Sequence, residues 1–219
     1  MYVKKFLAPQ FKELGIGGTF FKPWNISLFG SNISVDDFPT MIAEPDGCIR
    51  LTAWDAGEHK GELSIGKYAL ISPGVRILAA KQIAIGDACM FGKGAYVTDS
   101  DWHGIYDRTE VVGKPKEVSL GNNVWVGDSA IICKGVSIGD NSIIGAGAVV
   151  TKDVPPNKVY AGNPAKEVKH LDGEFISRQE LYKDPKKFFN DFDLIDQYTL
   201  KPNTFLGWLR SIFFRTNKH

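Results

Sequence analysis

The chain has 219 residues, with 26 Lys and Arg against 25 Asp and Glu and a formal net charge of +1. This balance argues against a general nucleic-acid-binding protein, which would carry a strongly basic surface. A hydrophobic fraction of 43% is enough for a folded core. The cysteines, Cys48, Cys89 and Cys133, lack metal spacing, and we expect them to be reduced and structural. No apolar run reaches bilayer length and no signal-peptide core precedes residue 13, so we expect a cytoplasmic protein.

Residues 1–25 are aromatic and irregular, and Gly15, Gly17 and Gly18 disfavour a helix. From residue 26 to 62 isolated aliphatic residues suggest short strands with loops between them. Terminal units of a repeat stack are normally atypical, because a regular unit would leave core and strand edges exposed. We therefore predict that residues 1–25 form a cap and that the following segment forms degenerate first coils.

A six-residue period becomes regular at Ile65. It continues through Ile71, Ile77 and Ile83, slips by two residues, and resumes at Ile85, Phe91 and Val97. Lys81–Gln82 stands just before the slip, and we expect it to bulge at a corner. Asp101 would occupy the next inward position, where an unpaired carboxylate is costly, so the repeat should stop near Thr98.

Residues 99–117 form the one long interruption of the repeat. Loops longer than about 12 residues in a compact fold are usually functional or disordered. This loop contains His103, the only one of the four histidines within the main repeat region, with Asp99 and Asp101 close to it in sequence. An imidazole can accept and return a proton near neutral pH, so a histidine in such a loop is compatible with proton-transfer chemistry.

The clearest repeat extends from Leu120 to Val154. Every sixth residue is aliphatic (Leu120, Val126, Ile132, Ile138, Ile144, Val150), and the fifth position of each unit is small (Val124, Ala130, Val136, Ser142, Ala148, Val154). Because a strand alternates its faces, both positions can point inward, while Gly, Asn and Asp supply the tight turns. A fixed short period indicates stacked coils. We predict three short strands in each 18-residue coil.

Pro155–Pro156 lacks backbone donors and predicts the end of the sheet. Residues 171–219 are polar and aromatic with helical spacing. In residues 203–219 the apolar side chains share one helical face. Such a face normally packs on the protein itself or on a neighbouring subunit. The alternative is an amphipathic helix that lies on the inner surface of the cytoplasmic membrane.

The repeat and its ending, VVTKDVPPNKVYAGNPAKEVK, resemble the hexapeptide-repeat acyltransferases, in particular galactoside and maltose acetyltransferases, over roughly residues 60–170. The resemblance implies an all-β fold: a left-handed parallel β-helix over residues 26–170, with a cap at 1–25, the loop 99–117 and a helical extension at 171–219. It also implies a homotrimer, because one face of the prism supplies only half of a coenzyme groove.

The same resemblance implies an O-acetyltransferase that uses acetyl-CoA as co-substrate, acts on a surface-polysaccharide or lipid-linked saccharide, and needs no metal. His103 matches the general base, and Asp99 or Asp101 could orient its ring. Where related enzymes place an Asn as oxyanion donor, this chain has Ser72–Pro73–Gly74. The positions that match coenzyme contacts are Trp125, Asp128, Ala146, Thr151, Lys152, Ala161, Lys166 and Lys169.

Other functions remain open at this point. N-acetylation of an amino sugar or of a xenobiotic would use the same coenzyme. Some left-handed β-helices are zinc enzymes that hydrate carbon dioxide, but they need three histidines around one metal. A non-catalytic scaffold is a further alternative, against which the intact His-bearing loop argues.

Overall fold

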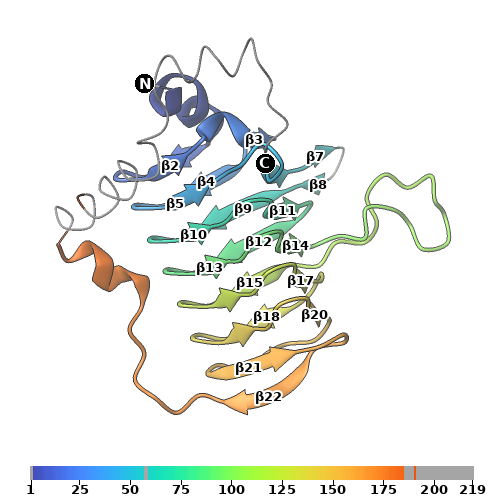
Figure 1. The fold of residues 1–219 in the computed structure, drawn as a ribbon. Helices are drawn as coiled ribbons and strands as arrows, with labels where there is room; N and C mark the ends of the chain where they lie inside the picture. Colours follow the sequence, from blue (N-terminus) through green and yellow to red (C-terminus); the bar gives the residue numbers. More distant parts are fainter. Residues whose placement is uncertain (1, 57–58, 185–189, 191–219) are drawn as a thin grey trace, which may run out of the picture. The chain divides into compact units, whose positions relative to one another are not determined.

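The computed structural model describes residues 2–56, 59–184 and 190. Residues 1–178 and 179–219 form two compact units. The first unit is a stack of short strands in three parallel sheets, a parallel β-helix (Figure 1). Each turn of the chain contributes one strand to each sheet in succession, so the neighbours in a sheet come from successive coils. A 3-10 turn (η4, Arg178–Tyr182) spans the boundary between the two units in the sequence.

Three sheets carry the fold. Sheet A contains β1 (Glu13–Leu14), β4 (Ile33–Val35), β9 (Glu62–Ile65), β12 (Gln82–Ile85), β15 (Val118–Leu120) and β18 (Ser137–Ile138). Sheet B contains β2 (Thr19–Phe21), β5 (Thr40–Ile42), β10 (Leu70–Ile71), β13 (Met90–Phe91), β16 (Trp125–Val126), β19 (Ile143–Ile144), β21 (Lys158–Ala161) and β22 (Lys166–His170). Sheet C contains β3 (Ile26–Phe29), β6 (Ile49–Ala53), β11 (Arg76–Ala79), β14 (Tyr96–Thr98), β17 (Ile131–Ile132) and β20 (Val149–Val150).

The core confirms the predicted sequence pattern. The aliphatic first positions and the small fifth positions between Leu120 and Val154 are all buried. Ser142, the one polar member, donates a hydrogen bond from its Oγ to the Pro155 carbonyl (2.8 Å) and accepts one from the Lys158 N–H (3.3 Å). The buried hydroxyl is tolerated because it both donates and accepts a hydrogen bond.

The corners explain the Asn- and Asp-rich turns. Asn123, Asn141 and Asn157 adopt left-handed backbone angles, with φ between 57° and 60°. Their side chains form a ladder: Asn123 Nδ2 donates to Asn141 Oδ1 (3.0 Å), and Asn141 Nδ2 donates to Asn157 Oδ1 (2.9 Å). Asparagine tolerates this conformation better than most residues, and here its amide also links successive coils.

The coil length is 18 residues only in the lower part of the stack. There Ser119 Oγ donates to Ser137 Oγ, 18 residues further along the chain. Two coils above, the Lys67 N–H donates to Asp87 Oδ1 across 20 residues. The coil that contains the loop spans 35 residues, from the Asp87 N–H to Asn122 Oδ1. The additional residues lie at corners, so the inward register of every strand is preserved.

Both ends of the stack depart from the sequence prediction. Residues 2–25 include a π-helical turn (η1, Val3–Leu7) and two 3-10 turns (η2, Ala8–Gln10; η3, Pro23–Asn25). However, β1 and β2 already pair with β4 and β5, so the solenoid begins inside the segment predicted as a cap. Beyond Pro155–Pro156 only sheet B gains further strands. Residues beyond the two prolines have N–H donors, and β21 continues sheet B before β22 closes it in antiparallel fashion.

A hairpin of β7 (Asp55–Ala56) and β8 (His59–Lys60) extends one upper corner (Figure 1). Among the described residues no helix is long and apolar enough to cross a membrane. The predicted amphipathic segment 203–219 lies outside the residues that the structure describes.

We predict that Ile132→Ala lowers the free energy of unfolding by about 2–5 kcal/mol, because it leaves a cavity in a close-packed interior. Ile132 is fully buried, whereas Ile105 in the loop is 64% exposed, so Ile105→Ala is a matched control that should cost far less. Denaturant unfolding followed by circular dichroism measures both variants. Equal losses would contradict the inward assignment of the six-residue period.

Candidate active site

The long loop leaves sheet C after Thr98 and is fixed at its base by Trp102. The Trp102 indole N–H is shared between Thr98 Oγ1 (3.0 Å) and the Tyr96 hydroxyl (3.3 Å), both on β14. The Trp102 ring also meets the edge of Trp54, with 6.1 Å between ring centroids. Trp102 adopts a left-handed backbone angle, φ 65°. These contacts hold the residue before His103 against the outer face of sheet C.

Asp99 is fully buried. Its Oδ1 accepts the Ala80 N–H (2.7 Å), and its Oδ2 accepts the N–H groups of Lys81 (2.7 Å) and Gln82 (2.8 Å). Burial raises the pKa of Asp99, and the three backbone hydrogen bonds oppose that rise. Asp99 thus caps the corner at which the repeat slips by two residues. Its carboxylate is directed at this corner, away from a role at the His103 ring.

Asp101 also has another partner. It forms an ion pair with Lys134 Nζ. Lys134, which follows β17 in the next coil, also donates to the Lys114 carbonyl (2.9 Å). Together these contacts tie both halves of the loop to the coil below. The structure therefore places Asp99 and Asp101 at the loop base, but it joins neither carboxylate to His103, and their predicted catalytic roles stay predictions.

The His103 side chain is exposed. Within the described part of the chain, its imidazole makes no hydrogen bond or ion pair. Its backbone is closely packed, since a Cβ at Gly113 would lie 2.4 Å from the His103 carbonyl oxygen. The returning half of the loop therefore requires a glycine at position 113. The arrangement fixes the main chain of His103 and leaves its imidazole available to a ligand or a partner.

Three of the predicted coenzyme positions share one corner, between sheets B and C. The Gly147 N–H donates to the Asp128 carbonyl (2.8 Å), which stacks the turn holding Ala146 on that holding Asp128. The Gly145 N–H donates to the Tyr160 carbonyl (2.8 Å), which brings Ala161 to the same corner one coil lower. Asp128 Oδ1 accepts the Lys93 N–H (2.9 Å). Two of the three predicted positions at this corner, Ala146 and Ala161, have small side chains that are at least partly exposed.

The remaining predicted positions divide between two places. Trp125 is 47% exposed on the outer face of sheet B, in register with Met90 and Ile143. Lys166 and Lys169 lie on β22 in the same sheet and are exposed. Thr151 and Lys152 follow β20 and lie at the next corner, between sheets C and A. Within one protomer the predicted set therefore spans two corners and the sheet B face.

Burial makes the thiols of Cys89 and Cys133 poor nucleophiles. Burial raises the pKa of the Cys89 thiol to about 12, and the thiol donates to the Gly121 carbonyl (3.1 Å). Burial, together with the negative charge of Asp101, also raises the pKa of Cys133. Thiolates are the reactive form of cysteine, so neither side chain is activated. The described residues contain no group of three or more His, Cys, Asp or Glu placed to hold a metal ion.

Comparison with known proteins identifies the family. Residues 117–152 match the model described as bacterial transferase hexapeptide (six repeats). Protein CapG of Staphylococcus aureus is 34% identical over 150 residues, which cover 67% of this chain and 77% of that protein. The chain therefore belongs to the bacterial hexapeptide-repeat transferase family, and its stack is a left-handed parallel β-helix, as the sequence predicted.

Two further relatives are named for acetyl transfer. The polysialic acid O-acetyltransferase of Escherichia coli O1:K1 / APEC is 39% identical over 127 residues, which cover 56% of this chain but only 41% of that protein. A galactoside acetyltransferase solved in complex with coenzyme A matches with 26% identity and a TM-score of 0.53, covering 77% of this chain and 70% of that one. The activity and the bound coenzyme in these names are properties of the two relatives.

We predict that Asp99→Asn destabilises the protein. An amide offers one acceptor oxygen to three N–H donors and leaves at least one of them unsatisfied, which costs about 1–3 kcal/mol. Asp107→Asn in the exposed part of the loop is the control and should change stability much less. Thermal unfolding measures both variants. Equal stability of the two would show that the Asp99 carboxylate does not hold the corner.

Proposed function

We propose that this protein is an acetyltransferase that moves the acetyl group of acetyl-CoA to a hydroxyl of a saccharide. The observation that carries the proposal is the single long loop of the β-helix, which fixes the His103 backbone and leaves its imidazole free. Family membership supports the reaction class, and the names of the two acetyltransferase relatives support a saccharide acceptor, with a surface-polysaccharide or lipid-linked sugar as the specific form.

His103 acts as the general base in this proposal. It removes the proton of the acceptor hydroxyl as the oxygen attacks the thioester carbonyl carbon. The resulting tetrahedral oxyanion collapses, the C–S bond breaks, and the proton passes from the imidazolium to the departing thiolate. The ester and free coenzyme A are the products. Direct transfer agrees with the raised thiol pKa values of Cys89 and Cys133.

The oxyanion requires a hydrogen-bond donor that is aimed at it. The backbone N–H groups of Ser72 and Gly74 donate to the Phe91 and Gly47 carbonyls, so they are already used. The side-chain hydroxyl of Ser72 remains at the position where related enzymes carry an amide. We assign it as the first candidate for the donor.

The coenzyme is proposed to lie along the corner formed by Asp128, Ala146 and Ala161. Small side chains there let an extended chain approach the backbone closely. Trp125 borders the thiol arm, Thr151 and Lys152 contact the coenzyme from the adjacent corner, and Lys166 and Lys169 pair with its phosphates as point charges.

The complete site is proposed to form between subunits of a homotrimer. No hydrogen bond or ring contact joins His103 to any of the coenzyme positions in the described part of one protomer. A neighbouring protomer would therefore bring its loop to the coenzyme corner. Cytoplasmic location fits the reduced cysteines. Peripheral membrane contact through residues 203–219 is a separate proposal.

We predict that His103→Ala lowers kcat by about 10²–10⁴-fold, because general base catalysis typically contributes that factor. Affinity for acetyl-CoA should stay within about twofold of that of the native protein. Thiol release from acetyl-CoA is followed with a panel of neutral sugars, acidic sugars and amino sugars, and calorimetry measures coenzyme affinity. His170→Ala, on β22, is the same substitution outside the loop and should retain turnover. Unchanged turnover in His103→Ala would refute the role of this imidazole.

A second test concerns the lysines. The double variant Lys166→Gln, Lys169→Gln should raise the KM for acetyl-CoA about tenfold, because it removes charge-assisted contacts with phosphates. The KM for S-acetyl-pantetheine, which has no phosphate, should not change. An equal rise for both donors would mean that the lysines support the fold of β22 rather than the phosphates.

A further inference from the structure

Two arginines lie side by side on the outer face of sheet C. Arg76 on β11 is the register partner of Arg50 on β6, and both side chains are exposed. Neither guanidinium has a carboxylate within ion-pair distance among the described residues. Like charges on adjacent strands repel each other, so this arrangement lowers stability unless an anion neutralises it. In contrast, Lys93 on the neighbouring turn forms an ion pair with Glu44 (3.4 Å).

The two arginines line a surface pocket of about 320 Å³ at the corner between sheets B and C. Gly47 and Gly74 form its wall without side chains, and the Gly74 N–H donates to the Gly47 carbonyl (2.9 Å). Asp46 is the one acidic residue in the lining and makes no ion pair with either arginine. The pocket thus combines a net positive charge with ten N–H donors on two planar guanidinium groups.

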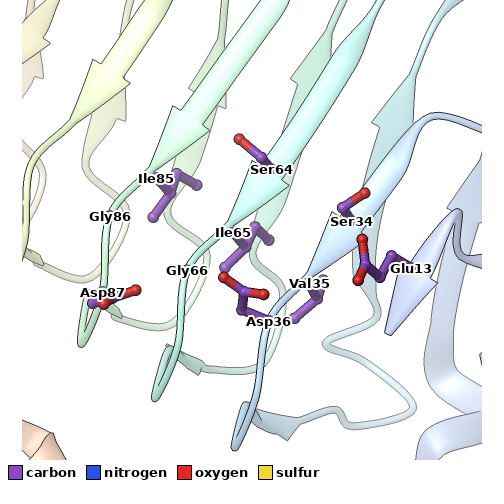
Figure 2. A pocket seen from close by; sticks show the side chains of 10 residues that line it. All are labelled: Glu13, Ser34, Val35, Asp36, Ser64, Ile65, Gly66, Ile85, Gly86 and Asp87. Atoms are coloured by element: carbon purple, nitrogen blue, oxygen red, sulfur yellow. The ribbon is translucent and has the colours of Figure 1, made fainter. Parts of the chain in front are cut away.

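A contrasting depression lies on sheet A (Figure 2). It has a comparable volume, about 280 Å³, but it is lined by small serines and by three carboxylates, those of Glu13, Asp36 and Asp87. Figure 2 shows these side chains along successive coils with no basic residue among them. The positive pocket is therefore a local feature of sheet C and does not follow from the repeat itself.

The arginine pocket is connected to the loop that carries His103. The guanidinium carbon of Arg76 lies 4.4 Å from the centroid of the Tyr96 ring. The Tyr96 hydroxyl in turn accepts a hydrogen bond from the indole of Trp102, the residue before His103. A ligand held by Arg76 would thus lie against the side chains that fix the base of the loop.

The pocket also shares a corner with the proposed coenzyme positions. The Gly94 N–H donates to the Pro73 carbonyl (2.9 Å), and the Ser129 N–H donates to the Lys93 carbonyl (2.8 Å), so these turns stack in one column. The column places the arginine pocket in the coils above the turn of Asp128 and Ala146. In the proposed trimer the acceptor would therefore lie on the protomer that supplies His103, and the donor along the matching corner of the adjoining protomer.

We propose that Arg50 and Arg76 bind an oxyanion of the acceptor, a carboxylate or a phosphate, so that the substrate is an acidic saccharide. This inference rests on the proposed acetyl transfer and specifies its acceptor. Guanidinium groups match both oxyanions with paired hydrogen bonds. The Tyr96–Trp102 contact then relates the bound anion to the position of the imidazole, and the acceptor hydroxyl is presented next to His103.

The test compares the native protein with the double variant Arg50→Gln, Arg76→Gln. Three probes are used: hexagalacturonate (carboxylate), glucose 6-phosphate (phosphate) and maltohexaose (neutral). Calorimetry measures their binding without acetyl-CoA, and thiol release measures transfer with it. We expect at least one acidic probe to bind tenfold or more tightly than maltohexaose, and the double variant to lose that preference. The preference should also fall as salt is raised. Whichever acidic probe binds identifies the oxyanion as carboxylate or phosphate.

Lys67→Gln removes an exposed charge at a different corner and should keep the preference. Size-exclusion chromatography with light scattering should give the same mass for all variants. Acidic probes that bind no better than maltohexaose, or that bind the double variant equally well, would overturn the proposal, as would a change of mass in the double variant alone. Arginine-dependent binding without acetyl transfer to any probe or sugar would support the anion site and count against the transferase function.

Discussion

The structure depends on the register between successive coils. An inward side chain of one coil is covered only by the inward side chains of the coils above and below it, as Ile65 pairs with Ile85 and Ile85 with Leu120. A shift of one residue would turn every aliphatic side chain of a strand toward water. Insertions are therefore tolerated where the chain turns, and the strands stay short and regular. Chemistry must be built at the corners or on the outward face.

The loop illustrates how such an insertion is stabilised. It enters the stack between Thr98 and Val118, yet β14 and β15 still pair with the strands of the neighbouring coils. Asp99 satisfies the backbone of one corner, Asp101 reaches the next coil through Lys134, and Trp102 lies against sheet C. Each of these side chains joins the base of the loop to the stack. His103 follows Trp102 directly, so its backbone continues from this attached base.

Much of the fold could be predicted because the six-residue period shows which side chains point inward and stack on those of the next coil. The burial of Ser142 among aliphatic residues follows from counting positions. The bulge predicted at Lys81–Gln82 lies instead at Ala80–Lys81, because Gln82 already pairs with Glu62 in β12. The partners of Asp99 and Asp101 could not be predicted this way, since they depend on which corner lies beside the loop. The first strands, β1 and β2, escaped detection because two or three residues show no period.

Pairs of outward-facing side chains on adjacent coils could not be predicted for a related reason. Arg50 and Arg76 become neighbours only because the hairpin β7–β8 lengthens the coil between them, and the sequence gives no sign of how much of that segment leaves the stack. Alternation identifies which residues face outward, but the lateral alignment of coils with unequal length requires the structure. Functional surfaces on such a fold are thus harder to predict than its core.

The central claim is that His103 faces a thioester held along the corner of Asp128, Ala146 and Ala161. A crystal structure of the protein with coenzyme A tests it most directly. The account predicts an extended coenzyme along that corner, with its sulfur next to the His103 imidazole of an adjoining protomer. A coenzyme bound elsewhere, or a sulfur remote from every His103 in the assembly, would contradict it.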